Sequence, residues 1–210
     1  MSTEGAAPKR VPDLPATFPG FERINRYYEG STGHWIAQIL PGDFYITRDD
    51  EIISTVLGSC VSTCMRDPRR GIGGMNHFML PEDPGGREGA SARYGLFAME
   101  QLINAFLTRG VRREALEIKI VGGGRVIAGM GDVGRSNVDF VREFLEAEGM
   151  PIQVEDVGLE VARRVRYRVR TGQMRVLHLP ISQNSKIAAR ESELASRIRD
   201  RVKRPSVELF

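Results

Sequence analysis

A β-hairpin around one tight turn is the feature that most constrains the fold of this chain. The stretch 55–81, TVLGSCVSTCMRDPRRGIGGMNHFMLP, carries two β-like runs on either side of Asp67-Pro68-Arg69-Arg70. Asp followed by Pro is the preference of a type I turn. A turn centred between Pro68 and Arg69 places Cys60 directly opposite His77, and such neighbours have Cβ atoms roughly 4.5–5.5 Å apart. The hairpin therefore predicts a thiol within reach of an imidazole.

The patterns around this hairpin predict an α+β fold, a mixed α/β sandwich. Strand-like runs are WIAQIL, DFYIT, IISTVL, LEIKIV and PIQVEDVG, and VRYRVR-TGQ-MRVLHL predicts a second hairpin. Apolar residues at helical spacing predict helices over 91–109 and 136–149. Strands outnumber helices and do not alternate regularly with them. We therefore expect a mixed β-sheet that contains the first hairpin, with two packed helices.

The length of the chain predicts one domain with tails, and its two cysteines and lack of long apolar runs predict a cytoplasmic protein. Its 210 residues can bury a proper core. We expect a flexible N-terminal arm over 1–20, a folded domain over 21–182 and a charged, mostly helical tail over 183–210 that is solvated. No run approaches the ~20 apolar residues that span a bilayer, so the chain is not expected to be membrane-embedded. A net charge of +3 does not imply nucleic-acid binding, and two cysteines four residues apart form no disulfide framework.

The predicted hairpin makes Cys60 a candidate nucleophile. A neighbouring imidazolium favours the thiolate, the reactive form of cysteine, and His77 is placed to supply it. The amides of Gly58 and Ser59, with that of Cys60, can point at a developing oxyanion. A third polar group must hold the imidazole, and the nearby candidates are Ser54, Thr55 and Asn76.

The cysteines, histidines and glycine-rich segments also have interpretations other than catalysis. Buried cysteine commonly acts as a small hydrophobic residue, the role that we expect for Cys64. A zinc site of Cys60, Cys64 and His77 lacks a fourth ligand at a usual spacing, so no metal is expected. We interpret His34 and His178 as surface or hydrogen-bonded histidines. The segment 129–134, GMGDVG, fits the dinucleotide fingerprint G-x-G-x-x-G, but GGGRVIA separates it from the preceding strand, so no cofactor is expected.

Several motifs in one order resemble the CheD family, the chemoreceptor glutamine deamidases of bacterial chemotaxis. They are LGSCVSTCMRDP…GGMNHFMLP, KIVGGG, VGRSN, GMPIQVEDVG and TGQMRV, and together they span roughly residues 36–178. The resemblance implies a cysteine hydrolase that converts selected receptor glutamines to glutamates, on a fold shared with a deamidating bacterial toxin domain. It implies that Cys60 and His77 are catalytic, so that the hairpin is a catalytic β-hairpin.

The third catalytic residue of the family is a threonine six positions before the cysteine. Ser54 stands at that position here, with Thr55 next to it. In a regular strand the two side chains point to opposite faces, so only one can reach His77. The offset selects Ser54, and Thr55 is the fallback.

The resemblance also implies the partners. The expected protein substrates are the cytoplasmic helical domains of chemoreceptors. An alternative is a mainly regulatory protein that docks on a CheC-type chemotaxis phosphatase, and the sequence alone leaves both open.

Overall fold

The strands of the chain form two five-stranded mixed sheets. The computed structural model describes residues 11–80, 88–126 and 133–203. The first sheet has the order β1 (Asn25–Glu29), β2 (His34–Gln38), β4 (Ile52–Leu57), β9 (Arg163–Arg168) and β10 (Gln173–His178). The second has the order β3 (Phe44–Thr47), β6 (Ile72–Asn76), β5 (Val61–Asp67), β7 (Glu117–Gly122) and β8 (Ile152–Val157).

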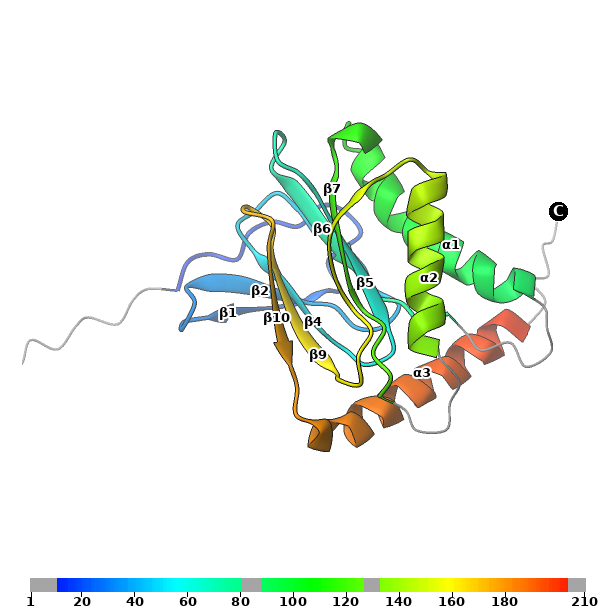
Figure 1. Ribbon diagram of the computed structural model, residues 1–210. Coiled ribbons are helices and arrows are strands. Elements are labelled where there is room, and N and C mark those ends of the chain that lie inside the picture. Colours follow the sequence, from blue (N-terminus) through cyan, green and yellow to red (C-terminus); the bar gives the residue numbers. More distant parts are fainter. Residues whose placement is uncertain (1–10, 81–87, 127–132, 204–210) are drawn as a thin grey trace, which may run out of the picture.

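Three long helices complete the described fold. Helices α1 (Glu88–Leu107) and α2 (Val133–Ala147) pack on the second sheet, α1 against β3 and β6 and α2 against β5 and β8. Helix α3 (Asn184–Lys203) crosses one end of the molecule, below the lower end of α2 in Figure 1. Short 3₁₀ turns cover Arg113–Ala115 and Ile181–Gln183. The α+β class is confirmed, but two sheets replace the single expected one.

The burial of the strands follows this layering. The central strands β5 and β6 are almost entirely buried, because the first sheet covers one face and the helices the other. Strand β9 alternates instead: Val165 and Tyr167 are buried, whereas Arg164 is exposed. Such alternation indicates a sheet with one solvated face. Strands β9 and β10 pair in antiparallel fashion, which confirms the second predicted hairpin.

The part of the N-terminal arm that is described is packed on the fold. The guanidinium of Arg109, just beyond α1, lies 4.3 Å from the ring centroid of Phe18. Phe21 is buried at the edge of the core and makes edge-to-face contacts with Phe44 and Tyr45. Residues 1–10 of the expected arm lie outside the described residues. Among the helices described, none is both long and apolar enough to cross a membrane.

Candidate active site

Cys60 lies where the chain crosses from one sheet to the other. The segment Gly58–Cys60 joins β4 in the first sheet to β5 in the second. The glycine-rich stretch after β7 holds this crossing: Gly124 N donates to Gly58 O at 2.8 Å, and Gly123 N donates to Cys60 O at 2.8 Å. Gly123 has a φ of +63°, a conformation that glycine adopts without strain. The KIVGGG motif therefore shapes the backbone beneath the thiol.

The register of the first hairpin differs from the predicted one. Cys64 pairs with Met75 and Asp67 with Ile72, and a bridge joins Val61 to Phe78. Direct opposition of Cys60 and His77 was therefore the wrong prediction. The reason is a longer turn, in which Gly71 N donates to Asp67 O at 2.9 Å and Gly71 has a φ of +65°.

The shift nevertheless keeps the thiol and the imidazole on one face. The partner of each residue moves by two positions, and side chains two apart in a strand share a face. Cys60 and His77 thus become diagonal neighbours, and among the described residues no hydrogen bond joins the thiol to His77 Nε2. Both are buried, at 0% and 2% exposure.

Thr55 orients the imidazole of His77. Its hydroxyl donates to Ile39 O at 2.9 Å, and its oxygen lies 2.7 Å from His77 Nδ1. Because the single hydroxyl proton is directed to Ile39, Thr55 Oγ1 accepts a hydrogen bond from Nδ1–H. His77 Nε2 is then left with a free lone pair, and it is buried without a hydrogen-bond partner among the described residues. This tautomer is the one that can accept a thiol proton.

The preference for Ser54 as the orienting hydroxyl is therefore corrected. Ser54 Oγ donates to Val165 O at 3.0 Å and makes no described contact with His77. The two adjacent residues of β4 point to opposite faces, as expected, but it is Thr55 that faces His77. Asn76, the other candidate, is occupied elsewhere, because its Oδ1 accepts from Thr63 N at 2.8 Å.

The amides expected to form an oxyanion site converge on one carboxylate, that of Glu191 in α3. Gly58 N donates to Oε1 at 2.8 Å and Ser59 N donates to Oε2 at 2.7 Å. Cys60 N donates to Oε1 at 3.2 Å, and the Ser59 hydroxyl donates to Oε2 at 2.7 Å. Three successive amides that bind one anion can also stabilise a developing oxyanion. We call Gly58–Cys60 the amide nest.

Burial dominates the electrostatics of the pair. It raises the pKa of the Cys60 thiol well above its ordinary value, and the charge and hydrogen bond of Glu191 raise it further. Burial also lowers the pKa of His77, and the Glu191 charge opposes that shift only in part. With α3 in place, the pair consequently rests as a neutral thiol beside a neutral imidazole.

Lowering the pH from about 7.5 to about 5 should destabilise the wild-type protein more than a His77→Asn variant. The unfolded chain takes up the histidine proton near pH 6.5, whereas the folded protein does so only at lower pH. Stability therefore falls as the pH drops through this window, by about 2 kcal/mol at pH 5. Urea unfolding of both proteins at both pH values measures the difference. Equal pH dependence would contradict the buried, neutral state of His77.

Asn137 is a site residue that sequence reasoning missed. This fully buried side chain of α2 donates from Nδ2 to Ser59 O at 2.8 Å and accepts at Oδ1 from Leu80 N at 2.7 Å. It thus ties the amide nest to the segment that follows His77. The VGRSN motif, which contains it, was the available signal. Glu191 was missed as well, because the tail was expected to be solvated.

The other candidates have structural environments. Cys64 is fully buried between the layers, and burial raises the pKa of its thiol. His34 Nδ1 lies 2.6 Å from Thr32 O, and His178 lies beside Asp156. No three described histidine, cysteine or acidic side chains are grouped to hold a metal ion.

The dinucleotide motif falls mainly on 127–132, outside the described residues. Gly134, its last glycine, lies in α2 against the backbone of Gly123 and Gly124.

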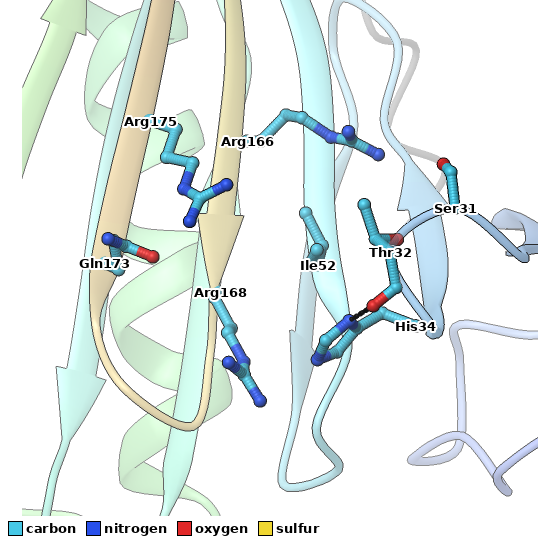
Figure 2. A pocket seen from close by; sticks show the side chains of 8 residues that line it. All are labelled: Ser31, Thr32, His34, Ile52, Arg166, Arg168, Gln173 and Arg175. Atoms are coloured by element: carbon cyan, nitrogen blue, oxygen red, sulfur yellow. Dashed lines mark hydrogen bonds between the residues drawn. The ribbon is translucent and has the colours of Figure 1, made fainter.

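A hollow of about 280 Å³ lies on the first sheet, away from Cys60. Three arginines from β9 and β10 contribute to its lining, which is shown in Figure 2. The lining residues are Ser31, Thr32, His34, Ile52, Arg166, Arg168, Gln173 and Arg175. Arg166 is paired with Glu29 and Arg168 with Asp50. Two of the three guanidinium groups in this hollow are therefore engaged in ion pairs within the fold.

Comparisons with known proteins agree with the motifs. The family described as "CheD chemotactic sensory transduction" matches residues 79–178. A relative from Halorhodospira halophila is 43% identical, with 98% of this chain and 99% of the relative aligned. One from Thiobacillus denitrificans is 46% identical, with 89% and 95% aligned. Both are named "Probable chemoreceptor glutamine deamidase CheD".

Among solved structures, Bacillus licheniformis hypothetical protein YfiH is similar with a TM-score of 0.39 and 16% identity. The similarity covers 56% of this chain and 51% of that one. The sequence relatives are far closer, and they align over nearly the whole chain. On their evidence, this chain is a member of the CheD family.

Proposed function

We propose that this protein is a chemoreceptor glutamine deamidase, a cysteine hydrolase that converts receptor glutamine side chains to glutamates. One observation carries the proposal: the amide nest binds a side-chain carboxylate beside a buried thiol and an imidazole held by Thr55. A glutamine carboxamide has the same shape as that carboxylate. The amides of Gly58 and Cys60, which both donate to Glu191 Oε1, can therefore donate to the carboxamide oxygen of a substrate in the same way.

In the first half-reaction, Cys60 Sγ attacks the side-chain carbonyl carbon of the glutamine. The thiol proton passes to His77 Nε2, and the amides of Gly58–Cys60 stabilise the oxyanion that forms. His77 then donates this proton to the departing nitrogen, so that the carbon–nitrogen bond breaks and ammonia leaves. A thioester between Cys60 and the former glutamine side chain remains.

Water completes the reaction. His77 Nε2, again unprotonated, takes a proton from a water molecule that attacks the thioester carbon. The carbon–sulfur bond breaks, and the thiolate recovers the proton from His77. The balance is one carboxamide and one water converted to one carboxylate and ammonium, with no electron transfer and no cofactor.

We expect folded receptor fragments to be deamidated much faster than free glutamine. Glu191 is the one charge among the described residues that shifts the pKa of Cys60 or His77. No described cation near the pair would therefore recognise the α-carboxylate of a free amino acid. Mass spectrometry of receptor cytoplasmic fragments should show the mass gain of Gln-to-Glu conversion, while ammonia release from free glutamine stays at background. Equal rates on both would contradict a protein substrate.

No contact of the described residues favours the alternative, a regulator that docks on a CheC-type phosphatase. A chain that serves only in docking has no need of an imidazole whose tautomer is set by a buried hydroxyl.

A further inference from the structure

Helix α3 fills the amide nest with one of its own side chains. Glu191 is 3% exposed, and its two carboxylate oxygens accept every hydrogen bond that the nest offers. The fit leaves no spare room, since a Cβ added at Gly58 would lie 2.7 Å from Glu191 Oε2. As Figure 1 shows, α3 crosses one end of the fold, below the lower end of α2.

The burial of this carboxylate is unusual, because no cation of the part of the chain that the structure describes pairs with it. Among the salt bridges of the described residues, none involves Glu191. A buried charge without a counter-ion is costly unless hydrogen bonds replace its hydration. The nest supplies those hydrogen bonds, so it is a site built for a side-chain carboxyl group.

The rest of the contact is small and apolar. Ile187, four residues before Glu191 and so on the same face of α3, is buried against a cluster separate from the main core. That cluster consists of Val126, Ala162 and Leu179, with Val56 packed against it. One polar contact accompanies it, from Asn184 Nδ2 to Glu160 O at 3.3 Å. Among the described side chains, one apolar anchor, one carboxylate and one exposed hydrogen bond therefore hold α3, and a contact of that size can open without disturbing the core.

The side chain that fills the amide nest, that of Glu191, has the chemistry of the product of the proposed reaction. Glutamate on a helix is the product of helix-borne glutamine deamidation, and α3 presents that group to the nest within the same chain. We infer that α3 is an internal pseudo-product, and that the groove it fills, lined by the amide nest and the Val126–Ala162–Leu179 cluster, is the docking surface for a helical segment of the substrate. This inference rests on the proposed function.

It follows that substrate binding and α3 binding exclude each other. While α3 is seated, the Cys60 thiol is fully buried and no substrate can reach it. The apparent affinity for substrate is then reduced by the fraction of molecules in which α3 is released.

Alkylation of Cys60 in the full-length protein tests the seated helix without requiring catalysis. The variants are Glu191→Ala, Ile187→Ser and the control Arg190→Ala, which removes a charge from an exposed position of α3 next to Glu191. Iodoacetamide labelling, assigned to Cys60 by peptide mass spectrometry, should accelerate at least about tenfold in the first two variants and remain unchanged in the control. Equal labelling rates in all four proteins would overturn the inference.

Deamidation of receptor fragments by the same proteins separates this inference from the proposed function. Relief of competition should lower KM in Glu191→Ala and Ile187→Ser, and a fall in kcat/KM would overturn the pseudo-product role. Faster labelling without deamidation by any of the proteins would sink the proposed function and leave the seated helix intact. If all the proteins deamidate receptor fragments but have identical labelling rates and KM values, the inference about α3 is wrong and the proposed function stands.

Glu191→Gln tests whether the helix is seated as a substrate would be. If it is, Cys60 should convert the new glutamine to glutamate, and the intact chain should gain the corresponding mass. A second protein that also carries Cys60→Ala should keep the original mass. If the glutamine persists while receptor glutamines are being converted, the side chain is held in an unreactive pose and the pseudo-product interpretation is wrong.

Discussion

Replacing Cys60 with alanine should abolish deamidation of receptor fragments while the protein stays folded. The proposed thioester cannot form without Sγ, and loss of a nucleophile removes at least about 4 kcal/mol of transition-state stabilisation, roughly a thousandfold in rate. The stability cost should be small, about 1 kcal/mol, because only one buried atom is removed. Mass spectrometry measures the rate, and circular dichroism with urea unfolding measures the fold.

Cys64→Ala is the matched control for this experiment. It removes the same atom from a second fully buried cysteine of the same hairpin. Cys64 pairs with Met75, outside the amide nest, so the variant should keep activity within about threefold. Wild-type activity in Cys60→Ala, or complete loss in Cys64→Ala, would refute the assignment of the nucleophile.

Thr55→Val should lower deamidation by more than about tenfold, which corresponds to more than about 1.4 kcal/mol. Valine keeps the shape of the side chain but removes the oxygen that accepts from His77 Nδ1–H. Without this partner the imidazole is free to take the other tautomer, which has no lone pair for the thiol proton. Steady-state kinetics on receptor fragments measures the loss.

Two further variants distinguish positioning from a general structural effect. Thr55→Ser retains the hydroxyl and should recover most of the activity, although it removes a buried methyl group. Ser54→Ala, which breaks only the hydrogen bond to Val165 O, should stay within about threefold of wild type. A silent Thr55→Val together with an inactive Ser54→Ala would show that the orienting group was wrongly assigned.

The hairpin shows how far local patterns can be trusted. Asp67 and Pro68 correctly predicted a turn, and the β-like runs correctly predicted two paired strands. The pattern did not predict that the turn extends to Gly71, so the direct partner of Cys60 was wrong by two positions. The face was still correct, because side chains in a strand alternate with a period of two.

The orienting hydroxyl shows a different limit. Alternation in β4 correctly implied that only one of Ser54 and Thr55 could reach the imidazole, but it could not say which. That depended on how β4 sits between β2 and β9, and on the approach of His77 from the second sheet.

The sequence by itself determined the elements whose signals lie within a few residues: the turn and the two hairpins. Only the tertiary structure decided which groups meet across the fold. Asn137 is 78 positions from Ser59, and Glu191 is 133 positions from Gly58. Turn preference and strand alternation are local properties of the backbone, whereas the contact of a distant side chain depends on the packing of every layer between. For that reason the tail, which its charges alone indicated to be a solvated helix, is found with one carboxylate buried in the candidate active site.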